Sequence, residues 1–188
     1  RRLVGSEMCI RDRPDGVSDE VASCITLKGI TAEYLLHRAY PLKKGDKVLY
    51  HAAAGALGQI LCPWANALGA EVIGTVGSKA KEEIAKKNGC HHVINYSEKD
   101  FVKEVEKIFG KNSLDVVYDG VGSKTFKGSI ETLKIRGMMV AFGNASGYVE
   151  TLDIKKDINA KGLFFTRPSI AHYTCLLYTS DAADDVIS

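Results

Sequence analysis

The stretch Lys47–Gly58, KVLYHAAAGALG, predicts a short buried strand that runs into a loop of small residues. Dinucleotide-binding loops usually follow the pattern G-x-G-x-x-G. Here Ala53 takes the place of the first glycine, while Gly55 and Gly58 keep the other two. The first glycine serves a tight turn, which alanine accommodates if its φ stays negative; the second lets the backbone approach a pyrophosphate, and the third lets the helix pack close to the strand. Taken alone, the loop leaves a cofactor cradle and an ordinary strand-to-helix turn equally open.

Short β-branched runs alternate with helical stretches from this loop onward. The expected strands are Lys47–Ala52, Glu71–Val76, His92–Asn95, Leu114–Asp119, Gly137–Phe142 and Leu163–Thr166. The expected helices between them are Leu57–Leu68, Lys79–Asn88, Phe101–Phe109 and Thr125–Leu133. Strands separated by helices of this length predict βαβ units with right-handed crossovers. We therefore expect an α/β fold with one doubly wound parallel sheet, the architecture of Rossmann-type dinucleotide-binding domains.

Two helices are expected before the first strand. Ser18 is placed as the N-cap of a helix that runs to about Leu27, with acidic residues in its first turn. A second helix is expected from about Gly29 to Tyr40, where Pro41 stops it.

Composition sets the broad class of the protein. Of the 188 residues, 45% are hydrophobic and 26% charged, which is typical of a globular protein, and the net charge of +2 favours neither nucleic acid nor an anionic membrane. No run approaches the roughly 18 apolar residues that a membrane span needs. The five cysteines form no CxxC pair, so neither a disulfide framework nor a metal site is expected. A cytoplasmic location is the default expectation.

The two ends of the chain stand apart from this pattern. Residues 3–13 and 175–185 resemble translations of a sequencing-library adapter and of its complement. On this interpretation 1–13 and 175–188 are non-native segments, and 14–174 is the dinucleotide-binding domain with its preceding helices. The alternative is that both ends are natural termini, and the nucleotide record would decide.

The end of the second expected strand indicates which dinucleotide is bound. An acid at this point would bind a ribose 2′-hydroxyl and select NAD. The sequence instead has Gly77 and Ser78, followed by Lys79 and Lys81, with no acid before Glu82. Gly77 and Ser78 leave room and offer hydrogen-bond donors, and the two lysines offer positive charge. This combination suits a 2′-phosphate and therefore favours NADPH. The alternative is that both lysines belong to a solvated helix face.

A family resemblance emerges from several motifs taken in order. They are HAAAGALGQILCPWANALGAEVIGTVGSKAK, HHVINYSEKDF, LDVVYDGVG, RGMMVAFGNASG and LFFTRPS. Together they resemble the NADPH-dependent quinone oxidoreductases, the zinc-free, zeta-crystallin-like branch of the medium-chain dehydrogenase/reductase superfamily, over essentially all of 14–174. The resemblance implies NADPH as cofactor, a quinone or activated alkene as acceptor, and a catalytic domain that is largely missing from this chain. It also implies a homodimer formed through the edge strand near Leu163–Thr166.

The resemblance also implies a set of cofactor-binding residues. They are Gly77, Ser78 and Lys81 at the 2′-phosphate, Tyr96, Val121 and Gly122 at the adenosine, Gly55, Ala56 and Leu57 at the pyrophosphate, Phe142, Gly143 and Asn144 at the nicotinamide ribose, Thr166, Arg167 and Pro168 near the nicotinamide, and Thr31 and Tyr34 facing the cofactor from the domain junction. Tyr96 has an alternative role as an edge-of-core tyrosine. For Thr31 and Tyr34 the alternative is burial in the helical layer.

No residue is assigned a catalytic role. The cofactor supplies the hydride, and the family mechanism does not use Asp119 as a general base. The pair His91-His92 lacks a third metal ligand, and Cys62 and Cys90 are expected to be small hydrophobic residues.

Three functions stay open at this point. The first is an NADPH:quinone oxidoreductase fragment, and the second is a zinc-free enone or alkenal reductase of the same superfamily. The third is a non-catalytic NADPH-binding module with a structural or nucleic-acid-binding use, which the modest net charge does not favour. Because half of the substrate cleft is missing, we expect 14–174 alone to bind NADPH weakly and to turn over little.

Overall fold

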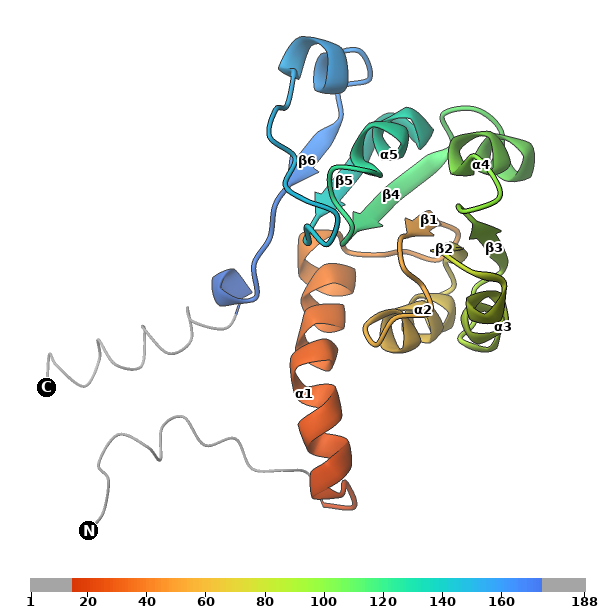
Figure 1. The fold of residues 1–188 in the computed structure, drawn as a ribbon. Coiled ribbons are helices and arrows are strands. Elements are labelled where there is room, and N and C mark those ends of the chain that lie inside the picture. Colours follow the sequence, from red (N-terminus) through yellow and green to blue (C-terminus); the bar gives the residue numbers. More distant parts are fainter. Residues whose placement is uncertain (1–14, 174–188) are drawn as a thin grey trace, which may run out of the picture.

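Six parallel strands form one sheet in the order β3-β2-β1-β4-β5-β6 (Figure 1). The structure, a computed structural model, describes residues 15–173, so the two expected non-native segments, 1–13 and 175–188, lie outside the described residues. The strands are β1 (Lys47–Tyr50), β2 (Glu71–Val76), β3 (His92–Asn95), β4 (Leu114–Asp119), β5 (Leu133–Ala141) and β6 (Phe164–Thr166). The sheet confirms the expected doubly wound α/β fold.

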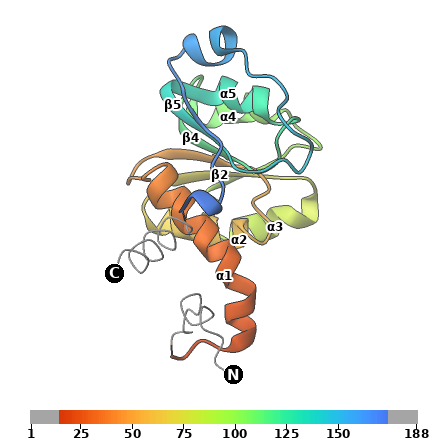
Figure 2. The same cartoon turned by 90° about the vertical axis from the view of Figure 1, so that its left-hand side faces the viewer.

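Helices cover both faces of the sheet (Figure 2). They are α1 (Asp19–Glu33), α2 (Gly58–Ala67), α3 (Lys79–Lys87), α4 (Phe101–Phe109) and α5 (Phe126–Thr132), with π-helical segments at Tyr34–Ala39 and Ile154–Asn159. Val48 and Tyr50 of β1 belong to a core shared with α1, α2 and α3, whereas Leu49 belongs to a second core shared with α4 and α5. Successive residues of one strand therefore point to opposite apolar layers, as a sheet buried on both faces requires.

The two helices expected before β1 are one continuous element. Ser18 caps α1 as expected, and its hydroxyl accepts a hydrogen bond from the N–H of Val21 (3.3 Å). Gly29 does not break the helix, because an isolated glycine costs only about 1 kcal/mol there and the buried residues Ala32, Leu35 and Leu36 that follow belong to the core on this side of the sheet. The element ends in a π-helical turn in which Tyr40 N–H donates to the carbonyl of Leu35 (3.3 Å).

The loop between β1 and α2 is fixed by close backbone contacts. A Cβ atom on Gly58 would lie 2.3 Å from the carbonyl oxygen of Ala53, so only glycine lets α2 start this close to the strand. Ala53 is absent from the residues with positive φ, as the sequence required, and the left-handed conformation falls on Ala52 (φ 64°). The methyl group of Ala53 fills the space that a side chain at Gly74 of β2 would need, because a Cβ atom on Gly74 would lie 2.6 Å from the Cβ of Ala53.

A buried polar network lies beneath this loop. The ring of His51 is within 2.9 Å of the Thr75 hydroxyl at Nδ1 and within 2.9 Å of the Ser129 hydroxyl at Nε2. Ser129 in turn donates to the carbonyl of Thr125 (2.9 Å) and lies 3.4 Å from the carboxylate of Asp119. Since both of these are acceptors, the Ser129 proton points to them, and His51 donates from Nε2 and accepts from Thr75 at Nδ1. A neutral His51 thus satisfies every member of the network.

Protonation of His51 is linked to folding. Burial lowers the pKa of His51 below its ordinary value, while the negative charge of Asp119 opposes the shift. The unfolded chain takes up the proton near the ordinary pKa of about 6.5, and the folded chain takes it up only at lower pH. The contribution of neutral His51 to the free energy of unfolding is therefore fully present above about pH 6.5. It is lost as the pH falls below that value, because the unfolded state then binds more protons than the folded state.

We predict that acidification from about pH 7.5 to about pH 5.5 lowers the free energy of unfolding through His51, with a slope of at most about 1.4 kcal/mol per pH unit for one proton. Urea denaturation at several pH values measures this slope. His51→Gln, which retains a donor towards Ser129, should be less stable at neutral pH and should show a flatter pH dependence in this window. His37→Gln, at an exposed histidine of the π-helical segment Tyr34–Ala39, is the matched control. An unchanged slope in His51→Gln would contradict the assignment.

Candidate functional site

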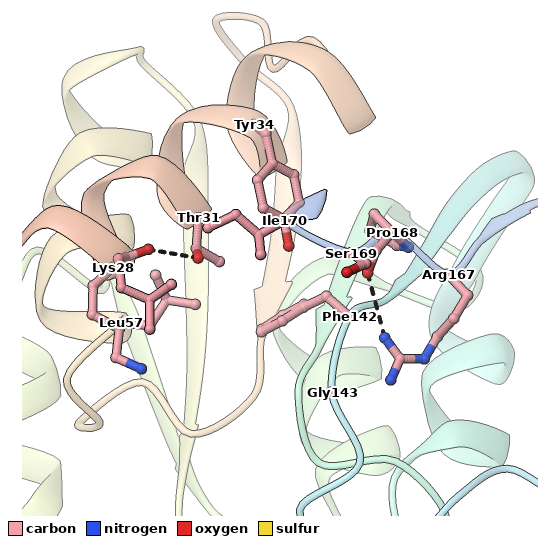
Figure 3. Close-up of a pocket in the computed structure, with 11 residues that line it drawn as sticks. Lys28, Thr31, Tyr34, Leu57, Phe142, Gly143, Arg167, Pro168, Ser169 and Ile170 are labelled. Carbon is pink, nitrogen blue, oxygen red and sulfur yellow. Dashed lines mark hydrogen bonds between the residues drawn. The ribbon is translucent and has the colours of Figure 1, made fainter. Parts of the chain in front are cut away.

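A cavity of about 580 Å³ opens at the carboxyl end of the sheet, on the α1 side (Figure 3). Its walls come from α1, from the end of the β1–α2 loop, from the segment after β5 and from the segment after β6. The lining residues are Leu27, Lys28, Thr31, Tyr34, Leu57, Phe142, Gly143, Arg167, Pro168, Ser169 and Ile170. Segments far apart in the sequence thus bring together seven residues that the resemblance implied: Thr31, Tyr34, Leu57, Phe142, Gly143, Arg167 and Pro168.

Tyr34 is the buried polar group of this cavity. Its ring stacks on Tyr173, with centroids 4.4 Å apart and planes inclined by 8°. Burial raises the pKa of Tyr34, the neighbouring Tyr173 raises it further, and the positive charge of Arg167 acts in the opposite direction. The Tyr34 hydroxyl is therefore neutral throughout the physiological range and can donate a hydrogen bond. The Thr31 hydroxyl on the same helix face donates to the carbonyl of Leu27 (2.7 Å), which leaves its oxygen able to accept.

The floor of the cavity depends on a close crossing of two loops. A Cβ atom on Gly143 would lie 2.4 Å from the carbonyl oxygen of Gly120 and 2.7 Å from its Cα. The Phe142 ring packs in parallel with Tyr50 of β1, with centroids 6.3 Å apart. The segments after β4 and β5 can approach this closely only because position 143 is glycine, while a Cβ atom on Gly120 would lie 2.9 Å from Cζ of the Phe142 ring.

The segment after β4 is held by Asp119. This buried carboxylate accepts hydrogen bonds through Oδ1 from the N–H groups of Val121 (2.8 Å) and Gly122 (3.0 Å). Its Oδ2 accepts from the Thr125 hydroxyl (2.7 Å). Gly122 has φ 97°, and a side chain there would meet the carbonyl oxygen of Gly147 at 2.4 Å. The structure therefore places two expected site residues, Val121 and Gly122, in a backbone turn that Asp119 fixes.

A second cavity of about 550 Å³ lies on the other side of the β1–α2 loop. Ala52 at one end of the loop lines this cavity, whereas Leu57 at the other end lines the first. The lining residues are Ala52, Tyr96, Lys99, Asp100, Phe101, Val121, Lys124, Thr125, Ala145 and Ser146. Tyr96 and Val121 are the two of these residues that the resemblance implied at the adenosine. The glycine loop thus separates two cavities at the point where the strand order reverses, between β1 and β4, which is where ligands bind in open α/β sheets.

The remaining expected residues lie around these cavities without lining them. Gly77, Ser78 and Lys81 lie where β2 passes into α3, and Gly77 contacts the hydroxyl end of Tyr96. Ser78 is the N-cap of α3 in extended backbone, and its hydroxyl makes no capping hydrogen bond within the helix. Gly55 and Ala56 are exposed in the loop, and Asn144 and Thr166 are half-buried beside lining residues.

Several lining residues were not expected from the sequence. Lys28 lies one turn before Thr31 on the same face of α1, and this i, i+3 spacing could have identified it. Lys99 and Phe101 reach the second cavity from the start of α4, Lys124 from the segment after β4 and Ser146 from the segment after β5, and no local pattern marks them.

The arrangement suits an elongated ligand with an anionic middle. The exposed Gly55 and Ala56 precede the first turn of α2, where backbone N–H groups have no partners inside the helix and the helix dipole favours negative charge. The cavities on either side provide space for the two ends of such a ligand.

Residues 15–173 contain neither a cluster of metal ligands nor a membrane-spanning helix. No three His, Cys, Asp or Glu side chains gather there in a way that could hold a metal ion. Cys62 and Cys90 are both buried, as expected for small hydrophobic residues, while His91 is exposed and His92 pairs with Glu71 (3.4 Å). Across the same span, the helices are too short or too polar to cross a membrane.

Relatives with known names match over most of this chain. A 2-haloacrylate reductase from Burkholderia sp. is 47% identical over 174 residues, which is 92% of this chain and 52% of that protein. Quinone oxidoreductase 1 from Escherichia coli (strain K12) is 46% identical over 161 residues, or 85% of this chain and 49% of that protein. The chain spans about half the length of the curated relatives it matches.

Solved structures agree with the fold. The crystal structure of Escherichia coli quinone oxidoreductase complexed with NADPH superimposes with a TM-score of 0.84 at 42% identity, covering 94% of this chain and 54% of that one. The family model described as zinc-binding dehydrogenase matches residues 56–187. Because this match extends over more than half of the sequence, the chain belongs to the zinc-binding dehydrogenase family.

Proposed function

We propose that this chain is the cofactor-binding part of an NADPH-dependent oxidoreductase that reduces quinones. The observation that carries the proposal is the pair of cavities on either side of the β1–α2 loop, with seven of the expected residues in the first. The NADPH-complexed Escherichia coli enzyme, at 42% identity, supports it.

The residues present fit NADPH. Gly55 and Gly58 leave the loop backbone bare and close to the helix start, so that a pyrophosphate could approach the N–H groups of α2. Ser78 has a hydroxyl without a capping bond, and Lys79 and Lys81 are exposed beside it, which suits a 2′-phosphate. Residues 15–173 hold no cluster of His, Cys, Asp or Glu that fits the zinc named in the family description.

In this proposal, bound NADPH supplies the hydride. The protein residues would orient the bound NADPH and shield it from water. Tyr34, neutral and buried, presents a hydrogen-bond donor at the wall of the first cavity, and Phe142 presents an apolar surface packed on Tyr50. Arg167 adds a positive charge at the same wall. No residue among those described is assigned the role of an acid or base.

A second candidate acceptor is an activated alkene. The 2-haloacrylate reductase is as similar to this chain as the quinone oxidoreductases are, at 47% identity. Both acceptors are electrophilic conjugated systems, so both suit hydride transfer without metal polarisation. A non-catalytic NADPH-binding module is a further alternative, and a cytoplasmic location stays a prediction from cysteine usage.

The acceptor can be identified with the full-length protein that contains this chain. We expect it to oxidise NADPH with a quinone at least tenfold faster than with 2-haloacrylate or an enone at equal concentration, roughly the ratio that 1.4 kcal/mol of transition-state binding gives. The 188-residue chain should show much weaker NADPH binding and little turnover. Faster oxidation with 2-haloacrylate would select the second candidate, and NADPH binding without turnover of any acceptor by the full-length protein would favour the non-catalytic module.

The choice of nucleotide can be tested on Lys81. Fluorescence titration should show tighter binding of NADPH than of NADH, and Lys81→Ala should weaken NADPH binding roughly tenfold, as expected for a lost charged hydrogen bond, with little effect on NADH. Lys87→Ala at the other end of α3 is the matched control. A preference for NADH, or equal loss for both nucleotides in Lys81→Ala, would refute the 2′-phosphate assignment.

We also propose a homodimer through β6. This strand pairs only with β5 in the described sheet and exposes Phe164 (49%) and Phe165 (37%) at the edge, which favours pairing with another strand. Sedimentation at tens of micromolar should show a dimer that Phe164→Glu converts to monomer. Ile84→Glu, which alters a similarly exposed side chain on α3, should leave the dimer intact. A monomeric parent chain would exclude this proposal.

A further inference from the structure

The segment after β6 ends in a turn that reaches back to the helical wall of the first cavity. The N–H of His172 donates to the carbonyl of Ser169 (2.9 Å), and the N–H of Tyr173 donates to the carbonyl of Ile170 (3.0 Å). Ser169 and Ile170 line the cavity (Figure 3), and Tyr173, which does not line it, stacks on Tyr34. One aromatic pair therefore joins the segment after β6 to the helix that carries Tyr34.

This stack restricts the side chain of Tyr34. The ring centroids lie 4.4 Å apart with planes inclined by 8°, and Tyr34 is only 3% exposed. Its ring cannot turn towards the side that Tyr173 occupies, so the position of its oxygen is fixed. A phenolic O–H prefers the plane of its ring, and the stack fixes this plane as well. Tyr173 thus sets the directions in which the Tyr34 hydroxyl can donate a hydrogen bond.

A π-helical turn supplies a second contact to Tyr173. Glu33 and Arg38 are five residues apart, whereas neighbours on an α-helix surface are three or four apart. The wider turn of the π-helical segment Tyr34–Ala39 brings them together, with Nε of Arg38 3.0 Å from Oε1 of Glu33 and Nη2 2.9 Å from Oε2. The remaining nitrogen, Nη1, donates to the carbonyl of Tyr173 (3.2 Å).

The two contacts of Tyr173 contribute in different ways. The side chains of Glu33 and Arg38 are 33% and 48% exposed, so their ion pair adds little to stability. Its effect is geometric, because a planar guanidinium held at two nitrogens directs the third at the carbonyl of Tyr173. The stack on Tyr34 supplies the energy, since an aromatic pair is worth roughly a two- to tenfold change in an equilibrium constant.

We propose that Tyr173 is a positioning residue for the first cavity: stacked on Tyr34 and held by Arg38, it directs the Tyr34 hydroxyl at a carbonyl oxygen of the bound ligand. A quinone and the amide of a nicotinamide both carry such an oxygen. The inference rests on the proposed function and deepens it, because it gives a residue outside the cavity a part in ligand recognition.

A double-mutant cycle in the full-length protein that contains this chain tests the proposal. Tyr34→Phe removes the hydroxyl and keeps the ring, and it should lower kcat/KM for the quinone or the affinity for NADPH roughly three- to tenfold, as expected for one hydrogen bond. Tyr173→Leu should lower the same quantity roughly two- to tenfold in the parent protein. In the Tyr34→Phe background it should cost less than about twofold, because no hydroxyl is left to orient.

The two ligands that carry a carbonyl oxygen are separated by the quantity that falls. A raised KM for the quinone at unchanged NADPH affinity places the hydrogen bond on the acceptor, and weaker NADPH binding places it on the nicotinamide. Equal losses from Tyr173→Leu in both backgrounds would overturn the proposal, because a purely structural role does not depend on the hydroxyl. A Tyr34→Phe variant with parent kinetics and parent NADPH affinity would overturn it as well.

Conservative and matched variants complete the test. Tyr173→Phe keeps the stack and should retain at least about half of the parent value. Arg38→Gln should reduce the same quantity as Tyr173→Leu, by a smaller factor, and it replaces Tyr173→Leu in the cycle if that variant fails to fold. Tyr148→Leu makes the same change at a tyrosine that is 70% exposed, and it should match the parent protein.

Failure of the proposed function gives a different result. A full-length protein that binds no nucleotide and reduces no acceptor removes the function and the role of Tyr173 together. If it binds NADPH without turnover, the cycle is measured on NADPH affinity alone. An active NADPH-dependent reductase with equal losses from Tyr173→Leu in both backgrounds overturns only the role of Tyr173.

Discussion

The carboxylate of Asp119 is the interaction on which the geometry of the site depends. It is buried at the end of β4, beside the point where the strand order reverses, and it receives hydrogen bonds at both oxygens. Burial of a carboxylate without hydrogen-bond partners costs several kcal/mol, about the order found for unpaired buried charges. The loss of any one donor would therefore destabilise the fold. One oxygen fixes the turn at Val121 and Gly122, and the other reaches through Ser129 to His51, the first residue of the β1–α2 loop. The loops after β1 and β4, which flank the reversal point, are thus both connected to the Asp119 carboxylate by hydrogen bonds.

Around this group, small residues occur in complementary pairs. The loop lacks the first glycine of the dinucleotide pattern, but Gly74 on the neighbouring strand provides the space that the Ala53 methyl group fills. The absent glycine is therefore compensated across the sheet. Gly120 and Gly143 lie at a second close approach, where a Cβ atom on Gly143 would meet the backbone of Gly120 and one on Gly120 would meet the ring of Phe142. Alanine at position 53 is compatible with the tight turn because its methyl group lies against Gly74 and because the positive φ falls on Ala52 instead of Ala53.

Much of the fold was predictable because strands buried on both faces form apolar runs between helices of regular length. The sequence could not show that α1 continues past Gly29, since the cost of a glycine is offset by tertiary packing of residues that follow it. Nor could it show that β5 starts at Leu133 instead of Gly137, because its pairing with β4 is interrupted by a register shift. In the site, motifs on single loops were informative, and Lys28 could have been found from its spacing with Thr31. Lys99, Lys124 and Ser146 could not, because they meet only after chain segments from different loops fold together. The role of Asp119 in holding the segment after β4 was not predictable either, because it depends on backbone N–H directions that only the structure provides.

The cavity groups and the network beneath them respond to different ranges of pH. Tyr34 has a raised pKa, so its hydroxyl keeps its proton well beyond neutral pH and the cavity wall does not change charge there. His51 has a lowered pKa and touches neither cavity, yet it precedes Ala52, whose left-handed backbone starts the loop between them. A proton on His51 would convert its acceptor nitrogen at Thr75 into a donor and so force the Thr75 hydroxyl to turn. Acid sensitivity of ligand binding would therefore arise from the support of the loop, through its conformation, and not from a change of charge at Tyr34.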